Sequence, residues 1–377
     1  MKKKVTNFFR IVDPFFIFCV VAFVVVIPIG FLCDYTHLET QCSEPPLLFL
    51  HDELKGTIPK PFSEFINSAT SRIQLVISQF NPHSSFSPYY DLLKNASDRG
   101  VKIEIVTNFR EIYQQFNFAD VTLFNSSESQ LFVFFAQADG KSSIYASRLF
   151  GAFSVPQGDF LIHFPNCKSF ANDASSLFTL IKDTALHGFP KLFPKTSMPG
   201  STFPSKHSLP TGGFCFFGIS PHNIQPPGRL SLETLASLFF GGTPGGNISV
   251  LTQAMFSSVE VVEEDMTKML LSEQLEKEAL QGSSIKIIVP LFEASSSKAE
   301  YRSLIQFSGI DIHTANMSYA PTFYTNGENC GFMPMPFEYI IVSKAITFAL
   351  HMTDEGVCTK LENHFMKVWN ETQVFVY

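Results

Sequence analysis

A pattern of strand, helix and strand occurs twice in this chain. In the first copy, Ile73–Phe80 and Val101–Phe109 flank the helix-like stretch LLKNASDRG; in the second, Ile248–Phe256 and Ile285–Phe292 flank LEKEALQGSS. The flanking runs are β-branched and mostly apolar on both faces, which is typical of parallel strands covered by helices. Each link is long enough for a right-handed crossover helix. The repeat therefore predicts two similar α/β halves in one chain.

The N-terminus predicts a membrane anchor. Basic residues at positions 2–4 and 10 precede Phe15–Cys33, an uncharged apolar run long enough to span a hydrocarbon core of roughly 30 Å. Acidic residues follow it, so the N-terminus is expected in the cytosol. A cleaved signal peptide is the alternative, but it usually has a shorter apolar core and a small-x-small cleavage site. We expect residues 1–14 to be a cytosolic tail and residues 15–33 to be a signal-anchor helix.

Two further features indicate a secretory location for the remainder of the chain. Sequons for N-glycosylation occur at Asn95, Asn125, Asn247, Asn316 and Asn370. Cysteines occur at Cys42, Cys167, Cys215, Cys330 and Cys358, an odd number that would leave one unpaired or intermolecular. These features predict a type II membrane glycoprotein whose C-terminal part is lumenal or extracellular, in the endoplasmic reticulum, Golgi or endolysosome or at the cell surface.

Beyond the anchor, the composition predicts four segments. Residues 34–50 form a stalk with two consecutive prolines, and residues 51–190 form the first half. Residues 191–213 are rich in Pro, Ser, Thr and Gly without periodicity, which is typical of a linker. Residues 214–377 form the second half, which closes on a helix over Val357–Glu371.

The charge and the motifs exclude several kinds of site. The formal net charge is −7, and Lys/Arg runs are missing beyond the N-terminus, which disfavours a nucleic-acid partner. The two glycine-rich signatures of nucleotide-binding sites, G-x-G-x-x-G and G-x-x-x-x-G-K-[ST], do not occur, and no Cys/His spacing indicates zinc. We therefore expect no cofactor and no metal. The histidines at His163, His222, His313 and His351 stand singly and are more typical of core or surface positions than of a catalytic set.

Several stretches resemble the phospholipase D superfamily, in particular its type II, lumenal branch of 5′-exonuclease-like proteins. They include IQLVISQF, GKSSIYAS at Gly140–Ser147, FLIHFPNC at Phe160–Cys167, IKIIVPLF and LENHFMKVW at Leu361–Trp369. The resemblance implies a duplicated fold of two similar α/β/α halves with mixed or parallel sheets, behind one N-terminal transmembrane helix. It also implies a disulfide between Cys42 and Cys167, which in that branch joins the stalk to the first half.

The chemistry of the family rests on two H-x-K-x-x-x-x-D motifs, one in each half. One His attacks phosphorus, the other protonates the leaving group, and the two Lys hold phosphate oxygens. Aligned on GKSSIYAS, the first motif has Phe132 at the His position and Phe134 at the Lys position, and only Asp139 remains. Asp139-Gly140 between two strands is also a strong hairpin signal. We therefore interpret Asp139 as a turn residue.

The second motif aligns best with Pro336, Glu338 and Ser343 at the His, Lys and Asp positions. No His in the chain is followed by Lys two positions later. The loss of nucleophile, acid and phosphate clamp predicts a pseudoenzyme that binds or regulates an unknown protein or lipid ligand and that could form a homodimer. Two alternatives stay open. One is a lumenal phosphodiesterase acting on phospholipid or single-stranded nucleic acid with rearranged catalytic residues; the other is an unrelated membrane-anchored adhesion or receptor-like protein.

Overall fold

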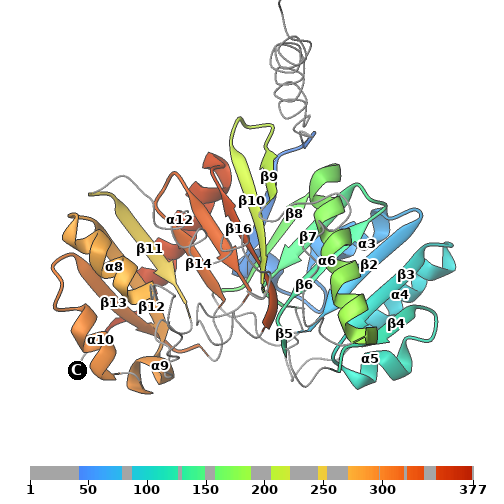
Figure 1. Cartoon of the computed structure of the whole chain (residues 1–377), viewed down its shortest axis with the longest axis horizontal. Coiled ribbons are helices and arrows are strands. Elements are labelled where there is room, and N and C mark those ends of the chain that lie inside the picture. The colour runs from blue at the N-terminus through green and yellow to red at the C-terminus, as the bar shows by residue number, and fades with distance from the viewer. Residues whose placement is uncertain are drawn as a thin grey trace, which may run out of the picture. The chain divides into compact units, whose positions relative to one another are not determined.

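Two mixed β-sheets with helices on their faces make up the part of the chain that the structure describes (Figure 1). The computed structural model describes residues 42–78, 87–125, 130–148, 158–187, 205–220, 245–252, 271–296, 298–317, 321–334 and 345–375. These belong to a single unit that begins at Gln41. The predicted anchor at residues 15–33 lies outside them. None of the helices described has both the length and the apolar character needed to cross a membrane.

The first half contains a seven-stranded mixed sheet in the order β1-β8-β7-β6-β2-β3-β4. The strands are β1 (Leu47–Leu50), β2 (Arg72–Ile77), β3 (Lys102–Thr107), β4 (Asp120–Leu123), β6 (Phe134–Ala138), β7 (Ser142–Ala146) and β8 (Phe160–Phe164). Strands β2, β3 and β4 are parallel, and α4 (Ser87–Asp98) lies between β2 and β3 in the chain. The first predicted strand–helix–strand unit is therefore confirmed.

The second half contains a ten-stranded mixed sheet with the path β17-β13-β12-β11-β14-β15-β16-β10-β9, and β5 pairs with β16. The strands are β5 (Gln130–Leu131), β9 (Ser205–Ser208), β10 (Phe214–Ser220), β11 (Asn247–Leu251), β12 (Ser284–Pro290), β13 (Ile310–Ala315), β14 (Thr322–Thr325), β15 (Cys330–Met333), β16 (Ala345–Met352) and β17 (Gln373–Val374). Strands β11, β12 and β13 are parallel, and α8 (Leu271–Leu280) precedes β12. The second predicted unit is confirmed as well.

The segment boundaries differ from the predicted ones in two places. Strand β1 and Cys42 lie in the stretch predicted as stalk, yet β1 is an edge strand of the first sheet and Cys42 is buried. Strand β9 lies in the stretch predicted as linker, yet it pairs with β10. The sequence SKHS of β9 is polar because an edge strand needs no apolar run, so composition alone did not reveal it.

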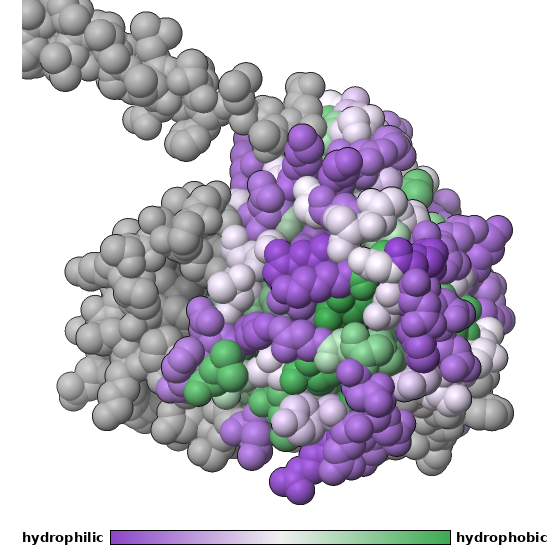
Figure 2. All heavy atoms as spheres, turned by 90° about the vertical axis from the view of Figure 1, so that its right-hand side faces the viewer, coloured by the Kyte–Doolittle hydropathy of each residue, from purple (hydrophilic) through white to green (hydrophobic). Residues whose placement is uncertain are grey.

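Helices cover both faces of each sheet, as the prediction of two α/β/α halves requires. On the first sheet, α3 (Lys60–Ser68), α4 and α5 (Arg110–Gln115) share one apolar cluster, and α6 (Lys168–His187) covers the other face. On the second sheet, α8, α9 (Leu291–Ser296) and α10 (Lys298–Leu304) cover one face, and α12 (Glu355–Glu371) covers the other. On the side of the first half that carries α4, α5 and β4, apolar residues show between hydrophilic ones (Figure 2).

The two halves share one aromatic core. The faces covered by α6 and α12 belong to the same apolar cluster. Rings of the first half meet rings of the second within it: Tyr145 lies 5.2 Å from Phe348, and Phe160 lies 5.2 Å from Phe332. Each closing helix also touches a strand of the other sheet, since α6 contacts β9 and α12 contacts β1. The halves are therefore one folding unit rather than two separable domains.

The start of the described chain is joined to its end by ion pairs. The 3₁₀ helix η3 (His51–Leu54) follows β1 and faces α12. Lys360 Nζ lies 2.8 Å from the Glu53 carboxylate and 2.7 Å from the Leu48 carbonyl oxygen. Lys367 Nζ lies 2.7 Å from Asp52. These contacts hold the last long helix against the first strand.

One disulfide fixes the N-terminal end of each closing helix. Cys42–Cys167 ends directly before α6, and Cys330–Cys358 ends in the first turn of α12. The bonds close loops of 125 and 28 residues, for which a chain-entropy treatment gives roughly 5 and roughly 3.5 kcal/mol of stabilisation. The fifth cysteine, Cys215, is free and fully buried, and burial raises the pKa of its thiol well above the usual value. Of the two outcomes open from sequence, the structure therefore supports an unpaired thiol.

The single histidines take structural positions. His163 on β8 shares a 2.8 Å hydrogen bond with Ser142 Oγ, and His351 on β16 is almost fully buried. Burial lowers the pKa of both to about 4. His313 stacks on Trp369 with ring centroids 3.6 Å apart. His222 lies outside the described residues.

The shared core predicts that a mutation in one half destabilises the other. We expect Phe160→Ala to lower the free energy of unfolding by about 3–5 kcal/mol, because it leaves a cavity at a fully buried ring. The chain has one tryptophan, Trp369, on α12 of the second half. In Phe160→Ala, the midpoint of the unfolding transition followed by Trp369 fluorescence should move to a lower denaturant concentration, together with the midpoint followed by circular dichroism. The exposed substitution Tyr113→Ala serves as control, and an unmoved Trp369 transition in Phe160→Ala would show independent halves.

The buried histidines predict loss of stability at mildly acidic pH. The unfolded chain binds protons at His163 and His351 below their ordinary pKa of 6.5, whereas the native chain binds them only near pH 4. Protons therefore favour unfolding between pH 6.5 and about pH 4. Each histidine can contribute roughly 3 kcal/mol to the free energy of unfolding above pH 6.5, and this contribution is lost as the pH falls to about 4. The buried carboxyls Asp159 and Glu362, whose pKa values burial raises, oppose part of this effect.

Urea unfolding at several pH values between about 7 and about 4.5 measures this loss. His163→Gln keeps a hydrogen-bonding group beside Ser142 but does not titrate, so it should flatten the pH profile. The exposed-site variant His187→Gln should leave the profile unchanged. A wild-type stability that stays constant across the window would contradict the proposed cause.

Candidate functional site

The His position of the first motif lies at the boundary between the halves. Strand β5 of the first half pairs with β16 of the second, with Leu131 opposite Ile346. The next residue, Phe132, donates its N–H to Ile346 O at 2.9 Å and accepts from Thr347 Oγ1 at 2.9 Å. Its ring is half-buried and packs against the apolar cluster of the second half. The position that would present a nucleophile is occupied by a packing contact.

The Lys position of this motif is inside the hydrophobic core. Phe134 begins β6, opposite Ile77 on β2 and Ala146 on β7. Its side chain is fully buried, and its ring centroid lies 5.7 Å from that of Phe62 on α3. An ammonium group in this surrounding would lose its hydration without gaining a counter-ion. The residue predicted at the Lys position is therefore a core residue of the first half.

Asp139, the one motif residue that remains, lies at the opposite end of β6 and serves the turn. Asp139 and Gly140 both have positive φ, 54° and 63°, and the Lys141 N–H bonds to Ala138 O at 3.0 Å, as in a type I′ turn. The carboxylate accepts the backbone N–H groups of residues 70, 71 and 72 at 2.8, 2.8 and 2.9 Å. Partial burial opposes its ionisation, but these hydrogen bonds hold the pKa of Asp139 well below its usual range. The carboxylate thus joins the hairpin to the loop that leads into β2.

The residues aligned with the second motif, Pro336, Glu338 and Ser343, lie outside the described residues, so that alignment stays a prediction. Strand pairing offers another register. Strand β2 lies between β3 and β6, just as β11 lies between β12 and β14, so β6 corresponds to β14. Phe134 pairs with Ile77 at the end of β2, and the residue of the second half that corresponds to Ile77 is Thr252, directly after β11. Continuing the β11–β14 pairing by one residue places Thr322 opposite Thr252, so Thr322 takes the position of Phe134. Threonine cannot supply the charge of the family's lysine, so this register also lacks the clamp.

A buried polar cluster lies at the boundary, and no sequence motif pointed to it. Asp159, directly before β8, is fully buried and accepts from Ser147 Oγ at 2.8 Å and from Arg148 Nε and Nη2 at 3.0 and 2.8 Å. Burial raises the pKa of Asp159, although Arg148 opposes this. A Cβ added to the adjacent Gly158 would meet Leu251 Cδ2 of the second half at 2.9 Å. The cluster therefore sits at a close contact between the halves, with its arginine held by Asp159.

The second half contributes hydroxyl groups at the ends of the corresponding strands. Thr252 Oγ1 lies 2.9 Å from Thr322 Oγ1, and both side chains are buried. In the part of the chain that the structure describes, no group of three His, Cys, Asp or Glu could hold a metal. The described boundary thus offers a paired Asp–Arg and hydroxyl groups, and His51 lies close enough to act electrostatically on Asp159.

One Ser/His/Asp set does occur, between α6 and β9. His207 Nε2 lies 2.6 Å from Asp173 Oδ2 and 3.0 Å from Ser205 Oγ, and Asp173 and His207 are buried. In a catalytic triad the acid and the serine contact opposite ring nitrogens. Here both face the same nitrogen, and the His207 ring lies against Phe170 with centroids 4.1 Å apart. The set is a link between the halves rather than a nucleophile with its base.

The predicted glycosylation sites have the exposure that glycan attachment requires. The five asparagines lie on α4, after β4, at the start of β11, after β13 and near the end of α12, and all five are exposed: Asn95, Asn125, Asn247, Asn316 and Asn370. Their glycosylation stays a prediction.

Comparison with known proteins gives fold relatives only. No protein-family model matches the sequence, and no curated protein matches it either. Among solved structures, phosphatidylserine synthase of Haemophilus influenzae aligns with a TM-score of 0.60 and 9% identity over 88% of this chain and 87% of that protein. Polyphosphate kinase of Porphyromonas gingivalis aligns with a TM-score of 0.54 and 11% identity over 85% of this chain but only 46% of the kinase.

A third structure, the phospholipase D family member Nuc of Salmonella typhimurium, covers 44% of this chain and 99% of its own at 14% identity and a TM-score of 0.34. At such identities the similarity concerns the fold and not the activity. The two mixed sheets, their matching strand orders and the two longer alignments agree: the described part of the chain has a phospholipase-D-like fold.

Proposed function

We propose that this chain is a single-pass type II membrane glycoprotein whose lumenal, phospholipase-D-like domain is catalytically inactive and acts by binding. One observation carries the proposal. In the alignment predicted from the sequence, Phe132 and Phe134 stand at the His and Lys positions of the first motif, and both rings are used in packing, Phe132 at the boundary between the halves and Phe134 in the core of the first half. A hydrolase needs a nucleophile, an acid and cations on the phosphoryl oxygens. Two phenylalanines supply none of them.

The proposed membrane topology is supported by the apolar run near the N-terminus and by the disulfides and sequons of the folded part. The apolar run at residues 15–33 supports the anchor. Two disulfides in one compact unit support an oxidising compartment, and five exposed sequons agree with it. The partner would be a protein or lipid ligand. A homodimer is part of the proposal, and exposed apolar side chains occur on both halves, among them Leu186 at 60% and Leu280 at 77%.

The alternative is a phosphodiesterase acting on phospholipid or single-stranded nucleic acid through rearranged residues. It has one observation in its favour, the polar cluster of Ser147, Arg148 and Asp159 that persists at the boundary. Arg148 is held by a buried carboxylate there, which removes most of its attraction for a phosphate. The proposal of an inactive domain is therefore the stronger one.

Turnover by the purified protein tests the proposal directly. The full-length chain, in detergent, is incubated with a short single-stranded oligonucleotide and separately with a labelled phospholipid. We expect no phosphodiester cleavage above that of a mock preparation. Cleavage that co-elutes with the protein on a sizing column would contradict inactivity and favour the alternative.

Restoring the family lysine should destabilise the protein rather than activate it. We expect Phe134→Lys to lower the free energy of unfolding by about 3–5 kcal/mol, because it places an uncompensated charge at a fully buried position. The apolar control Phe134→Leu should cost less than half as much. Denaturant unfolding of both variants measures the difference. Equal stability of the two would mean that water reaches this position, as it does in an open catalytic cleft.

A further inference from the structure

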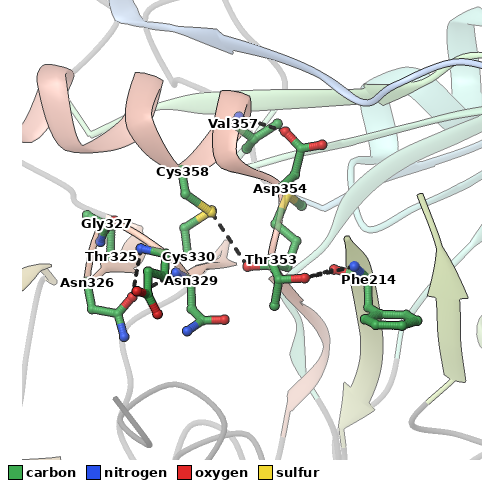
Figure 3. Close-up of a disulfide and its surroundings, with 12 residues drawn as sticks. Phe214, Thr325, Asn326, Gly327, Asn329, Cys330, Thr353, Asp354, Val357 and Cys358 are labelled. Carbon is green, nitrogen blue, oxygen red and sulfur yellow. Dashed lines mark hydrogen bonds between the residues drawn. A yellow bond between two sulfur atoms is a disulfide. The ribbon is translucent and has the colours of Figure 1, made fainter. Parts of the chain in front are cut away.

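A groove lies away from the boundary site, between the β9–β10 hairpin and α12. Its volume is about 920 Å³, and its walls come from residues 211–214 of the hairpin and from Thr353 and the first three turns of α12. Figure 3 shows Phe214, Thr353 and Asp354 where the two walls meet. Neither the family motifs nor the proposed inactivity involves this surface.

The walls of the groove are fixed by short contacts. The Thr353 N–H donates to Phe214 O at 2.9 Å, and the Phe214 N–H donates to Thr353 Oγ1 at 2.8 Å. Buried Asp354 accepts from Thr211 Oγ1 at 2.7 Å and from the Val357 N–H at 2.9 Å, so one carboxylate bonds to both walls. The Cys330–Cys358 disulfide holds the first turn of α12 from behind (Figure 3). A groove built this way needs no rearrangement before it binds.

The α12 wall presents polar side chains that the protein does not use elsewhere. Glu355, Thr359 and Asn363 follow one another at a spacing of four residues, so they lie on one side of the helix. All three are exposed, and within the described residues none of their side chains makes a hydrogen bond. A carboxylate accepts, a hydroxyl does both, and an amide donates and accepts through separate atoms. The wall therefore offers a mixed row of donors and acceptors.

Charge and apolar area decide which ligand class this row fits. Lys360 lines the groove, and its ammonium group donates to the Glu53 carboxylate and to the Leu48 carbonyl oxygen. Its charge is therefore largely neutralised, which weakens its attraction for a phosphate. The aromatic lining residue, Phe214, has Lys206 Nζ 3.7 Å from its ring centroid. Protein partners are bound mainly through buried aromatic or apolar anchors, and Lys206 already covers one face of the aromatic lining residue Phe214. An anionic ligand and a protein are both poorly matched.

We infer that this groove binds an uncharged oligosaccharide. Each sugar hydroxyl is both donor and acceptor, which matches the exposed carboxylate, hydroxyl and amide groups of Glu355, Thr359 and Asn363 on α12. An extended sugar chain also suits an open, preformed groove of this volume. The inference does not depend on whether the boundary site is inactive, because it uses different residues.

The experiment measures binding of the full-length chain to a printed array of uncharged oligosaccharides, with sulfated and phosphorylated glycans as a second arm. The protein is deglycosylated first and kept in a sugar-free detergent, so that neither its own glycans nor the detergent competes. We expect binding to uncharged glycans, and a loss of affinity of roughly tenfold or more in the double variant Thr359→Ala/Asn363→Ala. Alanine at exposed helical positions preserves the fold, which circular dichroism checks.

The matched control is Asn172→Ala, an exposed position on α6, the closing helix of the other half. It should bind as the wild type does. Three results would overturn the inference: no uncharged glycan bound, binding confined to the charged arm, or a double variant that binds like the wild type. Phosphodiesterase turnover, if found, would overturn the proposed function and leave this inference standing.

Discussion

The contact between aromatic rings of the two halves is the interaction on which the rest of the structure depends. Tyr145 of the first sheet lies 5.1 Å from Phe217 and 5.2 Å from Phe348 of the second, and its hydroxyl donates to Phe170 O on α6 at 3.0 Å. Exposing this face would bring a large number of apolar side chains into water, which disfavours either sheet on its own. The high phenylalanine content, 42 residues against one tryptophan, thus has a physical use. It fills the space between two sheets with flat side chains that need no hydrogen-bond partner.

The same packing explains how catalytic capacity and stability are connected here. An active site of this fold needs histidines and lysines held between the halves, which costs stability because charged groups must be partly desolvated. In the alignment predicted from the sequence, Phe132 and Phe134 would remove that cost and add contact area. Asp139 remains because its carboxylate satisfies three backbone N–H groups, a task that does not involve phosphate. At all three positions the side chain packs against or hydrogen-bonds to its neighbours in the folded chain.

Sequence reasoning succeeded where the pattern was local and failed where partners were distant. The units β2–α4–β3 and β11–α8–β12 could be predicted because apolar periodicity reports burial directly. The hairpin at Asp139 could be predicted from turn chemistry. Strand β9 could not, since its polar residues become a strand only by pairing with β10. The cluster of Asp159, Ser147 and Arg148 was missed because its members lie on neighbouring strand ends, eleven or twelve positions apart in the sequence. The row of Glu355, Thr359 and Asn363 on α12 was missed because polar residues at a spacing of four occur both on a solvent-exposed helix face and on the wall of a groove.

The contact of β1 and η3 with α12 has a consequence for how the protein is made. The first strand of the fold finds Lys360 and Lys367 only after more than three hundred further residues have been synthesised. Until then the edge of the first sheet has no helix beside it, and the face that α12 will share with the first half stays open. A chain that lacks α12 would therefore expose apolar surface of the first half to water. The first half reaches its final packing only after α12 has been synthesised.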